Sequence, residues 1–252
     1  MSKKIETFAL PPGRKIGKRY TVESLLGGGS EGEVYRVQEQ YTGIVRAAKI
    51  YFPHCDPDKR LSIRHARKLD KLRRCPVVLQ YHHSEDLVIR RQHTIAVISE
   101  LCEGVPLWNW VQQHRGKRLS PFVAMNVLFD LVCGLEEVHD MGEYHSDVHS
   151  ENILIRPCGV GFELKLIDFY EWGRPTKAKM QQDILDAIRV FYEILGGQTY
   201  YSKLPNEAKK ICLGLKTSQI LVRYPTITVL RRHLQTFEST TPGWQSSRLT
   251  KT

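Results

Sequence analysis

The chain has 252 residues, of which 41% are hydrophobic and 25% are charged. This balance excludes a disordered or fibrous chain, and the length suffices for one large domain or for two lobes that share a site. The net charge is +10, and the excess lies in residues 1–19, with six basic residues against one acidic, and in residues 58–74, with eight against two. Such segments suit an acidic partner or nucleic acid, or else form a solvated basic face.

The cysteine pattern and the hydropathy indicate where the chain resides. The six cysteines are widely spaced without a CxxC pair, and the chain opens without the apolar core of a signal peptide. Both features predict a reduced, cytoplasmic protein. The longest apolar stretch, residues 122–135, contains Asn126 and Asp130 and is shorter than the ~20 residues that a membrane span needs. We therefore expect no membrane-spanning segment.

The first half of the chain, from residue 20 to about residue 101, has strand periodicity. Apolar and polar residues alternate in short runs such as EVYRV (33–37) and TIAVISEL (94–101). One helix interrupts these runs: Asp56-Pro57 supplies an N-cap and a first-turn proline, and Cys75-Pro76 ends the helix. The pattern predicts a strand-rich lobe with one helix.

The second half of the chain has mainly helical periodicity. The predicted helices are residues 106–116, Ser120-Pro121 to Met141-Gly142, 183–195 and about 206–237, and the predicted strands are 152–156 and 162–167 around a turn at 157–159. Serine and threonine are frequent in residues 238–252. We expect this tail to be disordered.

A glycine cluster lies between the first two predicted strands. Gly27, Gly29 and Gly32 have GxGxxG spacing, and Val34 follows. Missing Cβ atoms let backbone N–H groups approach an anion closely. A dinucleotide-binding motif requires a helix directly after the glycines, whereas residues 33–37 alternate like a strand. We therefore expect the glycines in a hairpin.

A lysine follows the glycine cluster in the apolar segment AAKIY. If Lys49 points inward, its ammonium needs an anionic partner. A strand lysine with its ammonium at the surface is the simpler alternative. Together, however, a glycine hairpin and a strand lysine are suited to cover and grip the phosphates of a nucleotide.

A polar cluster with the chemistry of phosphoryl transfer lies in the second half. YHSDVHSENILI places Asp147 and Asn152 in one loop, and Asp168 follows the apolar run FELKLI. Carboxylate and amide oxygens hold Mg²⁺, and a carboxylate can orient an attacking hydroxyl. The competing interpretation is a metal site at His145 and His149, which would need both on one helix face.

In this order and with these gaps, the motifs GxGxxGxV, AxK, HxD(x)4N and DF resemble the protein kinase superfamily over residues 20–237. The resemblance implies an α+β, bilobal fold. Its parts would be a strand-rich N-lobe with one helix at 20–102 and a mainly helical C-lobe at 103–237, after a basic extension at 1–19. It also implies ATP and Mg²⁺ as cofactors and a serine or threonine of a protein as the favoured acceptor.

The same resemblance assigns roles to individual residues. Asp147 would be the catalytic base, and Asn152 and Asp168 would bind Mg²⁺. The residues expected at the nucleotide are the covering loop, the phosphate-binding lysine and the hinge that bonds the adenine: Gly27, Gly29, Gly32, Val34, Lys49, Glu100 and Cys102. The histidine that matches His145 is structural in the family.

The sequence departs from the family in the first lobe and after Asp168. Positions around His65 and Ala66 lack the helix glutamate that pairs with the matching lysine, and Asp70 is the one nearby acid. Tyr170 replaces the glycine of DFG. These departures favour a second hypothesis, in which the chain is a pseudokinase that acts as a binding module.

The segment after Asp168 is short. We take Asp183 to open the large central helix, which leaves no room for a full activation segment with an APE motif. In addition, HSDVHSEN is similar to the HGDxHxxN loop of aminoglycoside and choline kinases, with His149 where protein kinases usually have lysine. A small-molecule kinase is therefore a third hypothesis. Against it, residues 208–234, with RYPT, resemble the closing helices of protein kinases.

Overall fold

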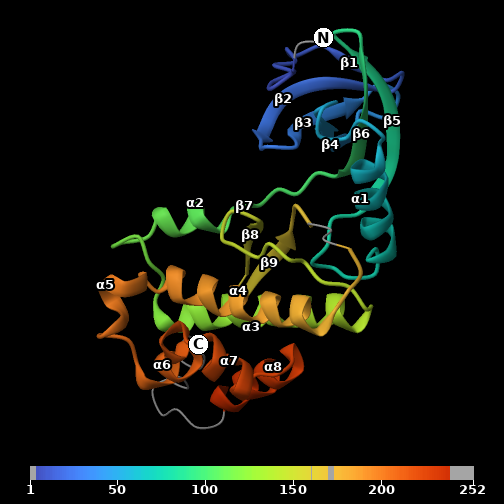
Figure 1. Cartoon of the computed structure of the whole chain (residues 1–252). Coiled ribbons are helices and arrows are strands. Elements are labelled where there is room, and N and C mark those ends of the chain that lie inside the picture. Colours follow the sequence, from blue (N-terminus) through green and yellow to red (C-terminus); the bar gives the residue numbers. More distant parts are fainter. Residues whose placement is uncertain (1–3, 160, 170–172, 239–252) are drawn as a thin grey trace. The chain divides into compact units, whose positions relative to one another are not determined.

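The computed structural model describes residues 4–159, 161–169 and 173–238, which form two compact units divided between Glu103 and Gly104. Unit 1, up to Glu103, is built on a sheet, and unit 2, from Gly104, is mainly helical (Figure 1). The predicted disorder of residues 239–252 and the effect of Tyr170 concern positions outside the described residues.

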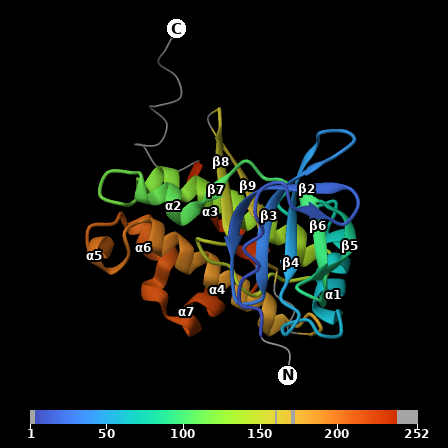
Figure 2. The same cartoon turned by 90° about the horizontal axis from the view of Figure 1, so that it is seen from above.

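Unit 1 contains a six-stranded antiparallel sheet with the order β1-β2-β3-β4-β6-β5. Its strands lie side by side in Figure 2. Their bounds are β1 Lys15–Ile16, β2 Tyr20–Gly28, β3 Gly32–Glu39, β4 Val45–Tyr51, β5 Tyr81–Ile89 and β6 Gln92–Glu100. Alternate residues such as Tyr35 and Val37 point into the core, as the predicted strand periodicity requires.

Residues 4–16, which we expected to belong to an extension, pack against this sheet. Ile5, Phe8 and Ile16 are buried in the core of unit 1. The buried carboxylate of Glu33 accepts hydrogen bonds from the Thr7 hydroxyl (2.6 Å) and from the Phe8 backbone N–H (3.2 Å). The sequence pattern hid this role because the basic residues around the three apolar ones dominate the composition.

The one helix of unit 1, α1 (Arg60–Lys71), begins later than predicted. Lys59, in the left-handed region with φ 59°, occupies the N-cap position. Asp56 still serves the helix, because its buried carboxylate accepts from the backbone N–H groups of Leu61 (2.8 Å) and Ser62 (3.1 Å). The extra residues form a turn before the helix, so the acid caps the helix from outside it.

The basic segment around α1 does not form one uniform surface. Arg60 pairs with Asp58 at 2.9 Å, Lys59 pairs with Asp86, and Lys68 is buried. Part of its positive charge is therefore neutralised or covered within unit 1.

Unit 2 has a small antiparallel sheet of β7 (Val105–Pro106), β8 (Ile153–Cys158) and β9 (Gly161–Leu166) in that order. Its helices are α2 Leu107–Gln112, α3 Pro121–Asp140, α4 Lys177–Ile194, α5 Gly197–Tyr201, α6 Asn206–Cys212, α7 Thr217–Arg223 and α8 Ile227–Gln235. The core lies between α3 and α4, which contribute Leu128, Leu131, Ile188 and Phe191 among other buried residues.

Helix α3 begins as predicted, because the Ser120 hydroxyl accepts from the Val123 N–H at 3.3 Å and Pro121 occupies the first turn. Three other predictions in unit 2 were wrong in detail. Helix α4 begins at Lys177, not at Asp183. The predicted 106–116 helix is the shorter α2, and β8 runs through the first two residues of the predicted turn at 157–159.

The helix predicted over 206–237 is divided into α6, α7 and α8. The first break follows from the left-handed backbone of Leu213 and Gly214, with φ 46° and 60°. A residue in that conformation cannot continue a right-handed helix. Within the described ranges, no helix combines the length and the apolar character needed to span a bilayer.

Candidate active site

The predicted glycines form the turn of the β2–β3 hairpin. The Gly29 N–H donates to the Gly32 carbonyl at 2.9 Å. A Cβ on Gly32 would lie 2.1 Å from the Ile50 carbonyl oxygen, so this position requires glycine. A Cβ on Gly27 or Gly29 would meet nothing within 4 Å. The hairpin therefore presents exposed backbone at its tip, where a phosphate can approach closely.

Lys49 lies on β4, where it pairs in register with Val34 of β3. Its ammonium is 3.8 Å from a carboxylate oxygen of Glu31, at the tip of the glycine hairpin. Neither side chain is more than a quarter exposed, so the two charges interact in a partly desolvated setting. Glu31 was not recognised from the sequence, because the family pattern directs attention to the helix.

The helix acid considered from the sequence does not face Lys49 in unit 1. The Asp70 carboxylate is exposed and lies 3.3 Å from Arg73 on the same turn. His65, in the part of the helix where the family's glutamate was expected, contacts Tyr51 on β4.

Glu100 ends β6 at the boundary of unit 1. Its backbone N–H donates to the Gln80 carbonyl, and its carboxylate accepts from the Gln80 N–H, both at 2.9 Å. These two bonds fix the strand end from which Cys102 follows. Cys102 is partly buried. This is the segment that the resemblance assigns to adenine recognition.

Asp147 and Asn152 meet in the loop between α3 and β8. The Asn152 side-chain N–H₂ donates to the Asp147 carbonyl (3.0 Å) and to Oδ2 of its carboxylate (3.1 Å). His149 Nε2 lies 3.5 Å from the same Oδ2. Because His149 Nδ1 accepts from the Glu151 N–H at 3.3 Å, the neutral ring carries its proton on Nε2 and points it toward Asp147.

Asp168 follows β9 and is linked to the same loop through Ile167. The Ile167 N–H donates to the Asn152 carbonyl at 3.0 Å, and the Ile167 carbonyl accepts from His145 Nε2 at 3.0 Å. Asp168 itself has φ 56°, an uncommon conformation for a residue with a side chain. Unit 2 therefore places Asp168 relative to Asn152 through short backbone contacts.

The alternative metal site at His145 and His149 is not supported by this geometry. His145 is fully buried, its Nε2 donates to Ile167, and its Nδ1 accepts from the Asp147 N–H at 3.2 Å. Its ring also packs on Phe169, with the ring centroids 4.3 Å apart. Both ring nitrogens are thus used to hold the loop, as expected for a structural histidine.

Asp183 on α4 is fully buried and supports the loop between α3 and β8, named the catalytic loop after the family motif that it matches. Its carboxylate accepts from the backbone N–H groups of His145 (2.8 Å) and Ser146 (2.7 Å), and His139 Nε2 lies 3.0 Å away. Ser146 has φ 75°, so the carboxylate holds an unfavourable backbone conformation in place. The available signal was an aspartate within an apolar helix, which must find donors once buried.

A second buried acid, Asp186, lies one turn further along α4. Burial raises the pKa of Asp186 to about 6, and the charges of Asp183 and Asp147 raise it as well, against the lowering effect of its Gln182 hydrogen bond and of Arg189. The Gln182 amide donates to it at 2.9 Å and Arg189 at 3.1 Å. The acids of α4 therefore contribute negative potential beneath the loop.

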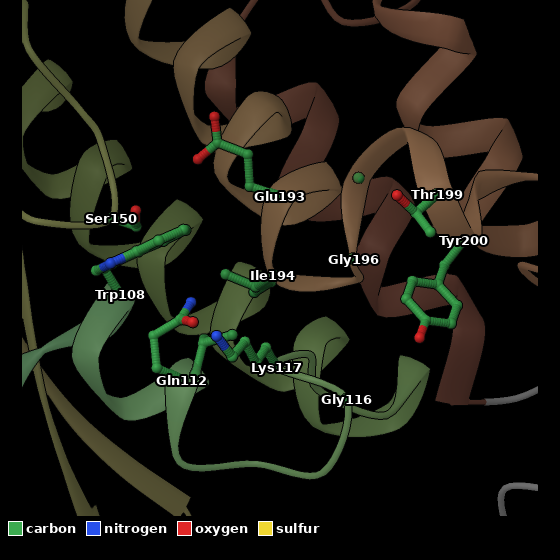
Figure 3. Close-up of a pocket in the computed structure, with 12 residues that line it drawn as sticks. Trp108, Gln112, Gly116, Lys117, Ser150, Glu193, Ile194, Gly196, Thr199 and Tyr200 are labelled. Atoms are coloured by element: carbon green, nitrogen blue, oxygen red, sulfur yellow. The ribbon is translucent and has the colours of Figure 1, made fainter.

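A pocket of about 510 Å³ lies beside the end of the catalytic loop (Figure 3). Figure 3 shows Ile194 between Glu193 and Lys117, with Trp108 and Ser150 along one side. The Trp108 backbone N–H donates to the Ser150 carbonyl at 3.0 Å, which joins α2 to the loop. The pocket has the size and the mixed lining of a site for one substrate group.

The segment after Asp168 is shorter than the sequence indicated, because α4 begins at Lys177 and only residues 169–176 intervene. Thr176 caps α4 by accepting from the Lys179 N–H at 3.3 Å. Lys179 in turn donates to the Arg174 carbonyl and to the Tyr144 hydroxyl, at 2.9 and 3.2 Å. The start of α4 is therefore fastened beside the catalytic loop.

A sheet unit with a glycine hairpin and a strand lysine, followed by a helical unit with an aspartate–asparagine loop, defines the class of nucleotide-dependent phosphotransferases. The known protein kinase domain matches residues 20–205, and the chain belongs to the protein kinase family. This confirms the family resemblance of its motifs.

Individual relatives agree with the family. The serine/threonine-protein kinase PkaB of Streptomyces coelicolor is 30% identical over 74% of this chain and 50% of its own length. A negative regulator of sexual conjugation and meiosis from Schizosaccharomyces pombe is 22% identical over 68% of this chain and 35% of its own length. This chain thus spans half or less of the length of these two relatives.

A solved structure confirms the predicted α+β kinase fold. The crystal structure of a double mutant of the Mycobacterium tuberculosis PknI kinase domain superposes with a TM-score of 0.64. The match covers 91% of this chain and 98% of that one at 17% identity. At this identity the likeness concerns the fold alone.

Proposed function

We propose that this chain is an ATP- and Mg²⁺-dependent kinase that transfers the γ-phosphoryl group to a serine or threonine hydroxyl of a protein. The observation that carries the proposal is the hydrogen bond from Asn152 to Oδ2 of Asp147, in a loop held from below by the buried Asp183. Such a supported carboxylate is what an acceptor hydroxyl needs in order to be oriented for attack.

The donor set of unit 2 fits Mg²⁺. Asn152 uses its amide nitrogen on Asp147, which leaves its amide oxygen for a cation. Asp168 adds a carboxylate whose backbone is anchored through Ile167. Amide and carboxylate oxygens are the ligands that Mg²⁺ prefers. We therefore assign Asn152 and Asp168 as its protein ligands.

Unit 1 fits the phosphates of ATP. Among the described residues, no group lies within 4 Å of a Cβ placed on Gly27 or Gly29 at the tip of the glycine hairpin, which leaves room for a phosphate, and Lys49 supplies a positive charge on β4. We assign Gly27, Gly29, Gly32 and Val34 to covering the nucleotide, and Glu100 and Cys102 to its adenine. ATP with Mg²⁺ would supply the transferable phosphoryl group and part of the charge neutralisation.

The catalytic step that we propose centres on Oδ1 of Asp147. Both contacts described above engage Oδ2, and within the described residues Oδ1 has no hydrogen-bond partner. Oδ1 is thus the oxygen that accepts the proton of the attacking hydroxyl. Asn152 fixes the carboxylate plane, and Lys49 offsets the charge that develops on the phosphate oxygens.

A small-molecule hydroxyl is the second candidate acceptor, and two observations favour it. Residues 169–176 are too few to form a broad platform for a peptide, and His149 directs its Nε2 toward Asp147 where protein kinases usually have lysine. The family match over residues 20–205 supports the protein acceptor instead.

The experiment is intact-mass spectrometry of the purified chain after incubation with ATP and Mg²⁺. The proposal expects added phosphates on serine or threonine in the wild type and in Asp140→Asn, an exposed acid at the end of α3, but none in Asp147→Asn. A panel of aminoglycosides, choline and sugars is tested in parallel. Turnover on one of these without protein phosphorylation would favour the second candidate.

A further inference from the structure

Tyr51 lies beside the lysine on β4. The two residues are two positions apart on one strand, so their side chains point to the same face of the sheet. The Lys49 ammonium is 5.4 Å from the centre of the Tyr51 ring. Tyr51 is only 1% exposed, so its ring forms a fixed wall beside the lysine.

The Tyr51 hydroxyl reaches helix α1. It lies 2.6 Å from Nδ1 of His65, and the two rings meet edge to face with centroids 6.2 Å apart and an interplanar angle of 72°. These values describe a well-formed hydrogen bond between a strand residue and a helix residue. The bond therefore connects α1 to the strand that carries Lys49.

Besides the hydrogen bonds from its first turn to the Asp56 carboxylate, α1 makes apolar contacts in unit 1. Its buried apolar residues are Ala66 and Leu69. Apolar contacts have no preferred direction and tolerate small shifts of a helix along a sheet. The Tyr51–His65 bond is directional, so it fixes the position of the helix against this strand.

We propose that Tyr51 and His65 are positioning residues that act on Lys49. Their bond takes over one task of the missing helix glutamate, namely to tie the helix to the lysine strand. The carboxylate of Glu31 meets the lysine separately. This inference rests on the proposed function, because the benefit of a well-placed lysine is realised in phosphoryl transfer.

The chemistry of the bond suggests selective substitutions. With a neutral ring, either the phenol O–H donates to Nδ1 or Nδ1–H donates to the phenol oxygen. Tyr51→Phe removes the bond in both cases and keeps the ring beside Lys49. His65→Leu removes it from the helix side, whereas His65→Asn places an amide near the position of Nδ1 and restores a partner.

The test measures kcat and KM for ATP in these variants and in the double variant Tyr51→Phe/His65→Leu. We expect Tyr51→Phe and His65→Leu each to lower kcat about tenfold and to change the KM for ATP less than threefold. The reason is that Lys49 loses its alignment while its contacts with the phosphates remain. The double variant should be no slower than either single one, and His65→Asn should recover most of the rate.

Matched controls remove similar groups elsewhere. Tyr192→Phe deletes a hydroxyl that bonds Gln198 at 3.0 Å in unit 2, and His93→Leu replaces an exposed histidine on β6. Both should keep the wild-type rate. Circular dichroism checks folding, and if Tyr51→Phe does not fold, the comparison of His65→Leu with His65→Asn decides.

Two results would overturn the inference without touching the proposed function. The first is a wild-type kcat in Tyr51→Phe and in His65→Leu while Asp147→Asn is inactive. The second is an equal fall of kcat in His65→Leu and in His65→Asn. Hydrogen exchange provides a readout that does not need transfer. The inference expects faster exchange of the α1 amides in Tyr51→Phe than in Tyr192→Phe, and equal exchange would contradict it.

Discussion

The catalytic loop of unit 2 and the surroundings of Lys49 in unit 1 are built differently. In the loop, the buried carboxylate of Asp183 accepts from two backbone N–H groups at 2.7 and 2.8 Å, and Asn152 donates twice to Asp147. Around Lys49, the partly exposed carboxylate of Glu31 lies 3.8 Å from the ammonium, and the Tyr51 ring forms an aromatic wall. The chain thus keeps the residues of the family motif in the loop of unit 2, whereas its contacts around the lysine differ from the family pattern.

The largest effect is expected from Asp183→Ala. This change leaves the buried N–H group of His145 and the partly buried N–H group of Ser146 without an acceptor, which costs about 3 kcal/mol of unfolding free energy. The strained Ser146 backbone would relax, so the transfer rate should fall at least ~100-fold. Denaturant unfolding and a transfer assay measure the two effects. A loss no greater than in Asp140→Ala would show that the loop does not depend on α4.

The next effect concerns pH and stability through Asp186. Since burial raises the pKa of Asp186 to about 6 from 3.8, the folded state binds its proton more tightly than the unfolded state. Ionisation of Asp186 therefore lowers the unfolding free energy as the pH rises from about 4 to 6. Above pH 6 this loss stays constant.

Asp186→Asn should thus raise the unfolding free energy by about 3 kcal/mol at pH 8 and by little near pH 4. Urea unfolding of wild type and variant across this range gives the difference directly. A difference that does not vary with pH would mean that Asp186 has the same pKa in the folded and unfolded states.

A smaller effect is expected at the pocket beside the loop. Trp108 is 46% exposed, so Trp108→Ala should leave the fold intact. If the pocket holds a group of the protein acceptor, the KM for that acceptor rises about tenfold, which corresponds to ~1.4 kcal/mol, and the KM for ATP is unchanged. Steady-state kinetics with Tyr41→Ala, a 90% exposed residue, as the control decides the matter. Equal KM values in the two variants would exclude the pocket from acceptor binding.

The smallest effect is expected from Glu31→Gln. The Glu31 carboxylate lies 3.8 Å from the Lys49 ammonium, and in the proposed site it would share that ammonium with nucleotide phosphates of the same sign of charge. Its neutralisation should therefore lower the KM for ATP about threefold. Glu163→Gln, which removes the ion pair with Arg156 on the β8–β9 hairpin, is the matched control. An increase in KM would indicate that Glu31 orients the lysine for the nucleotide.

Sequence periodicity and motif spacing predicted most of the fold, whereas the site residues named from the motifs stay predictions. Alternation in residues 33–37 predicted a strand of the sheet, and the Ser120-Pro121 pair marked the start of α3 correctly, because these signals are local. The predicted start of α4 was wrong because Asp183 resembles a helix-capping residue in the sequence. Its carboxylate instead accepts from backbone N–H groups of a loop that is distant in sequence.

The contacts around Lys49 were beyond sequence reasoning for the same physical cause. Glu31 and Lys49 meet because β3 and β4 pair in a given register, and Tyr51 meets His65 only once α1 packs on the sheet. A motif names the residue that is absent, here the helix glutamate, but it carries no information on which other side chains fill the space. Tertiary packing decides that.

The most direct test of the account compares nucleotide binding with transfer in Asp147→Asn. The equilibrium affinity for MgATP and the rate of γ-phosphoryl transfer are measured on the same preparation, with Asp140→Asn beside it. We predict that Asp147→Asn keeps the affinity within about twofold and lowers the rate at least ~100-fold, because general-base contributions are typically of that size or larger. A transfer rate equal to that of Asp140→Asn would contradict the assignment of Asp147 and the mechanism built on it.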